Sequence, residues 1–308
     1  MRIIDAQLHE FGPLLDWEAD AEDVSVQDRL LMEITLAWMD AVGVDAALLN
    51  PSRVGKPAGW GERAAARFPE RFAVVQTIHD LDADRVEEDV GSVASRPGLV
   101  ALRVGVGRVP QDPTGAAGAA RLAAGTYGPL FAACEAHRVP LFCFASGNLA
   151  LLPAVLEAYP GLTLIIDHIG MRQPPLDDLE VPPWRSLGEL LSLARYPGAA
   201  VKLCGAPAMS GEGYPFDDVW APLHAILDAF GPQRVMWASD IGRFAGRIGW
   251  DNQYPRAKGE YPGRHTYAES LGMLLHTDQL TSQEKHLLLG GTAVRLLSLA
   301  QWTTELKN

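Results

Sequence analysis

The sequence predicts one α/β domain over residues 1–308, a (β/α)8 barrel followed by C-terminal helices. Eight short apolar segments of strand length alternate with helical segments, as parallel strands and their crossover helices require. The chain has 308 residues, of which 48% are hydrophobic, enough for one large core. No GxGxxG turn follows the first strand, and eight strands in this length favour a closed barrel over a doubly wound open sheet.

In the first half of the chain, strands and helices alternate without a break. Apolar runs bounded by turn residues predict four strands: Ile3–Leu8, Val44–Leu49, Phe72–Ile78 and Leu99–Val104. A capping box at Ser25 and Asp28 and acidic first turns help to predict three helices: Ser25–Val42, Trp60–Phe68 and Asp82–Ala94. The segment 105–125 is rich in Gly, Ala and Pro, and it is predicted as a long loop at the rim.

The second half repeats this pattern and ends in helices. Four more strands are predicted: Leu141–Phe144, Leu162–Asp167, Ala200–Leu203 and Val235–Ala238. The helices predicted with them are Tyr127–Arg138, Leu151–Tyr159, Trp184–Tyr196, with a proline at its first turn, and Pro215–Phe230. Capping boxes at Thr266 and Thr281 open two further helices that carry the chain to Trp302.

The composition excludes several classes of partner. The formal net charge is −12, the pI is near 5.1, and no basic run collects the 26 Lys and Arg, so nucleic acid and an anionic membrane surface are not expected as partners. No stretch approaches the length of a membrane span, and no leader precedes the first strand, which predicts a cytoplasmic location. Oligomeric state is left open, and a homo-oligomer is one alternative.

The cysteines fit the same compartment. Cys134, Cys143 and Cys204 lie far apart, so they form neither a disulfide set nor a zinc-type CxxC. Cys204 lies near the end of a strand, where a nucleophile could stand. Buried cysteine is common, however, and we interpret Cys204 as part of the core.

Three residues at strand ends form the candidate active site, because a barrel of this kind carries its site at the carboxyl ends of its strands. Asp240 follows the eighth strand, and a carboxylate there persists only if it is paired, bound to metal or used in catalysis. His9 follows the first strand and His168 the sixth. Each alone would suit a capping or structural role, but three at matching ends predict a catalytic site. With a period of two, Asp5, Gln7 and His9 are predicted to share one face of the first strand.

Basic residues near the same strand ends predict a small anionic substrate, because arginine binds carboxylates through paired hydrogen bonds. They are Arg53, Arg103, Arg108, Arg172, Arg243 and Arg247. Ordinary surface ion pairs are the alternative for each of them. Lys202, on the seventh strand, is predicted either to contact substrate or to balance Asp240, and His79, at the end of the third strand, either to bind substrate or to cap the next helix.

Several segments resemble a known family. DAQLHEF at residues 5–11, LIIDHIG at 164–170 and RVMWASDIG at 234–242 resemble three signature strands of the amidohydrolase superfamily, in particular its amidohydrolase-2 branch of lactonases, C–C hydrolases and decarboxylases. LLLGGTAVRLL near the end of the chain is similar to the ending of that branch. The resemblance covers nearly the whole chain and implies a distorted (β/α)8, or TIM, barrel.

Gln7 departs from the family pattern, in which the first strand usually ends in His-x-His and both histidines bind metal. An amide oxygen is a poorer zinc ligand than an imidazole, and the fifth strand offers no further ligand. The resemblance implies two alternatives that stay open. His9, His168 and Asp240 hold a divalent ion such as Zn²⁺ or Mn²⁺, or the site works without metal, as in the 2-pyrone-4,6-dicarboxylate lactonase-like members.

The predicted function is hydrolysis of a small carboxylated lactone or a related cyclic ester. The resemblance implies that Asp240 takes a proton from water while His9 and His168 polarise the carbonyl or hold a metal. Ester hydrolysis needs a base and donors to an oxyanion, and this set offers both. The alternatives are a metal-dependent decarboxylase of a small carboxylic acid and a barrel that binds a ligand without turning it over.

Overall fold

A computed structural model describes residues 1–9, 24–50, 59–107, 114–173, 182–241 and 265–302, and the side chains of residues 24–28 lie outside this description. Eight strands form one sheet in which each strand pairs in parallel with the next. They are β1 (Ile4–Leu8), β2 (Ala46–Leu49), β3 (Phe72–Thr77), β4 (Leu99–Gly105), β5 (Leu141–Phe144), β6 (Leu164–Ile166), β7 (Ala199–Cys204) and β8 (Val235–Ala238). The predicted α/β barrel is confirmed.

The last strand returns to the first, which makes the barrel nearly closed. The main-chain N–H of Asp240, just after β8, donates to the carbonyl of Gln7 in β1 at 3.1 Å. The N–H of Ser239 donates to Oδ1 of Asp5 at 2.9 Å. The carboxyl ends of β1 and β8 are therefore adjacent.

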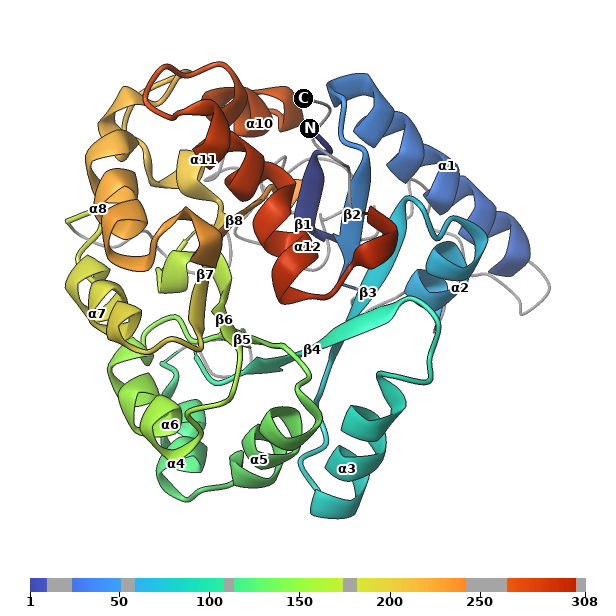
Figure 1. Cartoon of the computed structure of the whole chain (residues 1–308), viewed down its shortest axis with the longest axis vertical. Helices are drawn as coiled ribbons and strands as arrows, with labels where there is room; N and C mark the ends of the chain where they lie inside the picture. The colour runs from blue at the N-terminus through green and yellow to red at the C-terminus, as the bar shows by residue number, and fades with distance from the viewer. Residues whose placement is uncertain (10–23, 51–58, 108–113, 174–181, 242–264, 303–308) are drawn as a thin grey trace.

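Helices surround the ring of strands (Figure 1). Those between the strands are α1 (Val24–Val42), α2 (Trp60–Arg67), α3 (Ala83–Ser92), α4 (Ala116–Ala123), α5 (Gly128–His137), α6 (Leu152–Ala158), α7 (Leu187–Ser192) and α8 (Trp220–Phe230). After β8 come α10 (Tyr267–Leu275), α11 (Ser282–His286) and α12 (Thr292–Leu296), and a π-helical turn, Leu287–Gly291, joins the last two. In the part of the chain that the structure describes, no helix is both long and apolar enough to cross a membrane.

The core has two layers, because side chains alternate along each strand between the barrel interior and the helices outside. The interior is filled largely by small residues together with a few large ones. These include Ala6, Ala46, Ala73, Ala101, Phe142, Ile165, Ala200 and Met236. The outer layer packs the other strand face against the helices and includes Leu49, Leu102, Ile166 and Trp237.

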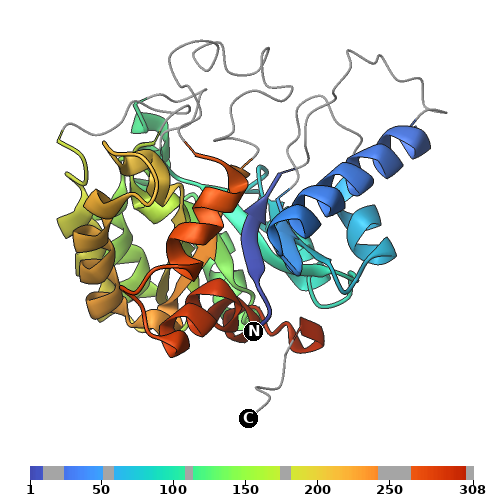
Figure 2. The same ribbon diagram turned by 90° about the horizontal axis from the view of Figure 1, so that it is seen from above.

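The amino end of the barrel is closed by the last helical segment. Ala293, Leu297, Leu299 and Trp302 join the interior cluster. The indole N–H of Trp302 donates to the carbonyl of Pro69 at 3.0 Å, and the N-terminal segment lies beside this last turn (Figure 2). The carboxyl end of the barrel is therefore the end at which the candidate site can lie.

The structure corrects some predicted boundaries. Residues 105–125 are not all loop, since the alanine-rich stretch within them forms α4, as alanine's high helix propensity favours. Trp184 has a φ of 64°, so α7 begins later, at Leu187. Phe216 has a φ of 62°, and α8 follows only after a 3₁₀ turn. The capping boxes at Thr266 and Thr281 are confirmed, whereas α1 begins at Val24, one residue before Ser25.

The predicted common face of Asp5, Gln7 and His9 is wrong for Asp5. The register of β1 against β2 shifts between Asp5 and Leu8, and such an irregularity breaks the period of two. Asp5 accepts hydrogen bonds from Ser239 Oγ and from Tyr267 Oη, the latter at 2.8 Å. Asp5 therefore braces the junction of β1, β8 and α10, while Gln7 and His9 contact each other at the carboxyl end.

Candidate active site

His9, His168 and Asp240 meet at the carboxyl end of the barrel. The Nε2 atom of His9 lies 3.3 Å from Oδ1 of Asp240, and the Nε2 atom of His168 lies 3.9 Å from Oδ2. The exposed fractions of the three side chains are 15%, 2% and 0%, in the order His9, His168, Asp240. The three residues that the sequence singled out thus lie together, with each carboxylate oxygen facing a different imidazole.

The backbone at two of these residues is unusual. Asp240 has a φ of 48° and His168 a φ of 53°, and the latter is followed by Ile169 at 59°. The left-handed region costs a residue with a side chain about 1–2 kcal/mol. Such strain often accompanies a functional site, where the surrounding contacts hold it in place.

Gln173 is one source of those contacts. Its side chain is buried, and its Nε2 donates to the carbonyl of His168 at 3.2 Å and to that of Cys204 at 3.0 Å. One amide therefore joins the ends of β6 and β7. We did not single out Gln173 from the sequence, because glutamine is mostly exposed and nothing in the pattern marks this one.

A buried charge network lies at the same end of the barrel. Asp167 Oδ1 is 2.6 Å from Lys202 Nζ, and Asp167 Oδ2 accepts a hydrogen bond from Arg103 Nε, also at 2.6 Å. Burial alone would raise the pKa of Asp167, but the two cations outweigh it and hold that pKa below its usual value. Burial lowers the pKa of Arg103, but Asp167 and the nearby Asp240 and Cys204 together raise that pKa above its usual value. Lys202 thus pairs with Asp167, not with Asp240 as one predicted alternative had it.

The same lysine explains the orientation of Gln7. Lys202 Nζ donates to Oε1 of Gln7, so the amide nitrogen of Gln7 faces His9 Nε2, at 3.2 Å. On its other side, His9 Nδ1 lies 2.6 Å from the carbonyl of Asn50, which can only accept. These partners assign the proton to Nδ1 of His9 and leave Nε2 as an acceptor. Gln7, where the family pattern has a metal ligand, therefore orients an imidazole.

Asp5 and Tyr267 brace the site from outside the barrel. Burial raises the pKa of Asp5 from 3.8 to about 6, although hydrogen bonds from Ser239 and Tyr267 oppose the shift. Burial, with the nearby Asp5 carboxylate, also raises the pKa of Tyr267. Ser239 directly precedes Asp240 in the chain. Its hydrogen bonds to Asp5 therefore hold the backbone in place next to Asp240.

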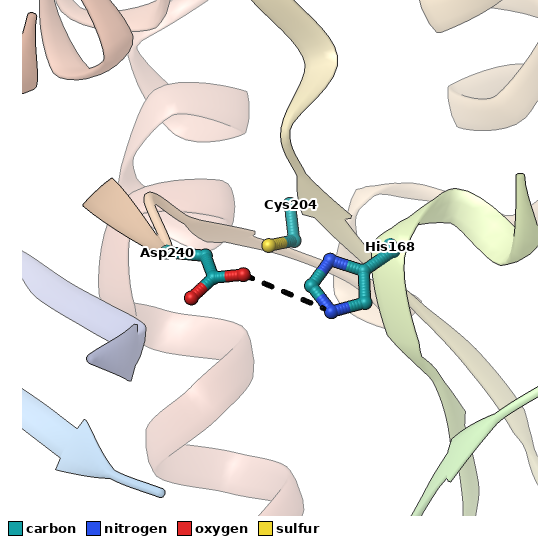
Figure 3. Close-up of side chains that lie close together, drawn as sticks. All are labelled: His168, Cys204 and Asp240. Atoms are coloured by element: carbon teal, nitrogen blue, oxygen red, sulfur yellow. Dashed lines mark ion pairs between the residues drawn. The ribbon is translucent and has the colours of Figure 1, made fainter. Parts of the chain in front are cut away.

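One group among the described residues has the donors for a metal ion. Ligand atoms of His168, Cys204 and Asp240 all lie within 4.8 Å of one another, and the three side chains point toward a common centre (Figure 3). Nitrogen, sulfur and oxygen donors are those that zinc binds, and three protein ligands are the usual number at a catalytic zinc. This donor set fits a zinc-like ion. It contains Cys204 where the predicted ligand set has His9. Metal binding by His9, His168 and Asp240 together stays a prediction.

The other predicted substrate contacts have mixed outcomes. Arg103 is partly buried and belongs to the charge network, and Arg172 is half-buried just after the turn at residues 167–170. His79 is exposed after β3, and Asp82 itself caps α3, so the capping alternative for His79 is wrong. Arg53, Arg108, Arg243 and Arg247 lie outside the described residues.

The fold is that of a (β/α)8 barrel, and two histidines and an aspartate are grouped at the carboxyl ends of its strands. A family model described as amidohydrolase (Amidohydro_2) matches residues 4–299. The chain therefore belongs to the amidohydrolase family, and it is an enzyme of that type.

Individual relatives are more distant. An L-fucono-1,5-lactonase of Burkholderia ambifaria is 32% identical over 103 residues, which cover 32% of this chain and 34% of the lactonase. The match thus spans about a third of that curated relative. A zinc-bound amidohydrolase from Burkholderia multivorans superposes with a TM-score of 0.69 at 21% identity, covering 97% of this chain and 99% of the other.

Two further solved structures have the same fold. A probable 2-pyrone-4,6-dicarboxylic acid hydrolase from Acinetobacter baumannii, with citric acid bound, has a TM-score of 0.64 at 15% identity, covering 97% of this chain and 100% of the other. A 5-carboxyvanillate decarboxylase from Sphingomonas paucimobilis has a TM-score of 0.57 at 16% identity, covering 96% and 99%. At such identities the likeness concerns the fold alone.

Proposed function

We propose that the protein hydrolyses a small carboxylated lactone or a related cyclic ester. The observation that carries the proposal is the convergence of two imidazoles on one buried carboxylate, His9 on Oδ1 and His168 on Oδ2 of Asp240. The partial match to a lactonase and the fold shared with a pyrone hydrolase support the choice of a lactone.

Asp240 is the general base in this proposal. Its Oδ1 and the Nε2 of His9 lie 3.3 Å apart, and the contacts of Gln7 and Asn50 leave Nε2 as an acceptor. A water molecule can donate to Oδ1 of Asp240 beside this imidazole. Asp240 takes one proton from this water as its oxygen attacks the carbonyl carbon. The same proton then goes to the ring oxygen when the C–O bond breaks, so that lactone and water give one hydroxy acid.

His168 serves the carbonyl oxygen. It lies in the turn after β6, and its ring packs edge-on against Phe144 with centroids 5.3 Å apart. A fixed donor at a buried site stabilises the oxyanion more than the neutral carbonyl, which accelerates the reaction. The sequence predicted that both histidines polarise the carbonyl. In this proposal His168 does so, while His9 lies beside Asp240 where the water is activated.

Arg103 is the described cation best suited to a substrate carboxylate. Its Nε is bound to Asp167, which fixes the plane of the guanidinium at the carboxyl end of β4. Its two terminal nitrogens form the other edge through which arginine pairs with a carboxylate. This supports an anionic substrate.

A zinc-like ion, when bound, supplies a Lewis acid for the carbonyl oxygen. His168 and Asp240 belong both to the predicted ligand set and to the donor group that the structure brings together. The acid–base roles of His9 and Asp240 on water are the same with or without the ion.

A metal-dependent decarboxylase is the second candidate, favoured by the shared fold of 5-carboxyvanillate decarboxylase. The two reactions differ in their products. Decarboxylation releases carbon dioxide and consumes no water, whereas lactone opening adds water and releases an acid. The third alternative, a barrel that binds without turnover, would show neither product.

The test is a panel of five- and six-membered lactones with and without carboxylates, together with aromatic carboxylic acids. Acid release and carbon dioxide release are measured separately on the full chain, before and after chelation. We expect acid release from a carboxylated lactone, with kcat reduced about 10²- to 10⁴-fold in Asp240→Asn, as for loss of a general base. Asp228→Asn, on the exposed face of α8, is the matched control and should keep the wild-type rate.

Folding of each variant is checked by circular dichroism. A folded Asp240→Asn variant that hydrolyses its lactone at the wild-type rate would contradict the assigned base. Carbon dioxide release without lactone hydrolysis would favour the decarboxylase, and tight binding without either product would favour the binding barrel.

A further inference from the structure

Cys204 lies at the centre of the candidate site, although the sequence led us to interpret it as core. It is the last residue of β7 and has no exposed surface, with a relative exposure of 0%. Its sulfur and the ligand atoms of His168 and Asp240 all lie within 4.8 Å of one another. In Figure 3 the thiol lies beside the ion pair drawn between Asp240 and His168.

The strand pattern places this thiol in the active-site layer. Ala200 and Cys204 belong to the interior cluster, and Lys202 between them reaches Gln7 and Asp167 inside the barrel. Cys204 is therefore one step of two residues beyond Lys202 toward the carboxyl end. The amide of Gln173, bonded to the carbonyls of His168 and Cys204, holds these two residues together.

The opposite side of the site, at β1, is poorly suited to a cation. The amide oxygen of Gln7 accepts from Lys202, and the amide nitrogen, which cannot be a ligand, faces His9. The ammonium of Lys202 also repels a cation near Gln7. The imidazole of His168, the thiol of Cys204 and the carboxylate of Asp240 are grouped instead at the ends of β6, β7 and β8.

We propose that His168, Cys204 and Asp240 are the three ligands of a site for a thiophilic divalent ion such as Zn²⁺ or Co²⁺. A thiolate ligand selects such ions over Mg²⁺, Ca²⁺ and Mn²⁺, which prefer oxygen. The bonds to a tetrahedral zinc, roughly 2.0–2.3 Å long, require ligand atoms about 3.3–3.8 Å apart, so side-chain movements of about 1 Å complete the site. Cys204 loses its proton to solvent when its sulfur binds the ion.

This proposal deepens the proposed function, because Asp240 belongs to both. It adds a metal ligand, Cys204, from β7. It also predicts a preference for thiophilic ions, which lactone hydrolysis alone does not require. The other two thiols provide a contrast. Burial raises the pKa of Cys134, in α5, to about 12, and it raises the pKa of Cys143, in β5, as well.

The test is a titration of the full, chelator-stripped protein with Co²⁺, followed by absorption spectroscopy and equilibrium dialysis. A thiolate bound to Co²⁺ gives a near-ultraviolet charge-transfer band that nitrogen and oxygen ligands do not give. We expect this band in the wild type and in the control Cys134→Ala. We expect it to be absent in Cys204→Ser and Cys204→Ala, with binding at least tenfold weaker. Serine at 204 is nearly the same size as cysteine, so this variant guards against a loss of fold.

Three results would overturn the proposal: no bound cobalt in the wild type, bound cobalt without the band, or an unchanged band in folded Cys204→Ser. The lactone panel is run on the same samples and separates the two proposals. A band without any lactone turnover would refute the proposed function and leave the ion site standing. Lactone turnover without bound cobalt would refute the ion site and leave the proposed function standing.

Discussion

The Nε2 atom of His9 faces Oδ1 of Asp240 across 3.3 Å, while Nδ1 of the same ring lies 2.6 Å from the carbonyl of Asn50. The neighbours of the ring therefore determine which nitrogen carries its proton. Lys202 fixes the amide of Gln7, and that amide in turn faces His9. Gln7 thus connects the ammonium of Lys202 to the imidazole of His9.

Gln7→Glu should change the pH dependence of the reaction. A carboxylate at position 7 still accepts from Lys202, but it can no longer donate to His9 and favours the protonated imidazole. We expect the acid limb of the kcat/KM profile to move to higher pH and the rate at neutral pH to fall about tenfold or more. Gln279→Glu is the matched control, since Gln279 lies 3.2 Å from His224 near the surface. Superimposable profiles for wild type and Gln7→Glu would remove Gln7 from this role.

Asp167→Asn should destabilise the fold far more than Lys202→Met. The first change leaves both Lys202 and Arg103 without their carboxylate, whereas the second leaves Asp167 paired with Arg103. Loss of one partner of a buried ion pair costs about 3–5 kcal/mol. Urea unfolding of both variants measures the difference, and equal effects would show that Arg103 does not compensate the charge.

The pH dependence of Asp167→Asn gives a second readout. The pKa of Asp167 is lowered in the folded protein, so its stabilising contribution is present above the ordinary carboxyl pKa. That contribution is lost as the pH falls through the lowered value. The variant should therefore lose less stability than the wild type on acidification.

Asp5→Asn should remove a pH dependence of stability whose sign is opposite to that of Asp167. The pKa of Asp5 rises from 3.8 to about 6 on folding, so the folded state binds the proton more tightly and stability falls as the pH rises through this window. The loss is about 3 kcal/mol, at about 1.4 kcal/mol for each pKa unit. Thermal unfolding between pH 4 and 7 should show this slope in the wild type and in Asp228→Asn, but not in Asp5→Asn. Parallel curves for all three proteins would mean that Asp5 is not protonated on folding.

Gln173→Leu should damage the site and moderately weaken the fold. Two buried carbonyls, those of His168 and Cys204, lose their donor, and each unsatisfied group costs about 1–3 kcal/mol. Because the strained turn at His168 is then less well held, we expect kcat to fall while KM changes little. Gln283→Leu, on the exposed start of α11, is the control. A variant with reduced stability and unchanged kcat would limit Gln173 to a structural role.

Local sequence patterns were sufficient to predict the barrel and the proximity of three candidate site residues. Short apolar runs located all eight strands, and Thr266 and Thr281 opened their helices as the capping boxes indicated. His9, His168 and Asp240 followed from one topological rule, that parallel strands present their carboxyl ends on the same side.

The remaining contacts depend on side chains that meet only in three dimensions. The pairing of Lys202 with Asp167 was not predicted, because strand alternation gives the direction of a side chain but not its partner across the barrel. Asp5 was misplaced by an irregularity in β1 that no local pattern marks. Gln173 and Cys204 have roles that become visible only once the ends of β6, β7 and β8 are adjacent.

The packing of Trp302 and Leu297 into the amino end of the barrel also constrains when the protein can fold during synthesis. These residues follow all eight strands in the chain, yet they belong to one interior cluster with residues of the first strands, among them Ile4 and Ala46. A nascent chain that has already produced β8 still exposes this end of the core to water. The final cooperative closure must therefore wait until the segment around Trp302 has left the ribosome, and a chain truncated before Leu297 should be a substrate for chaperones and proteases.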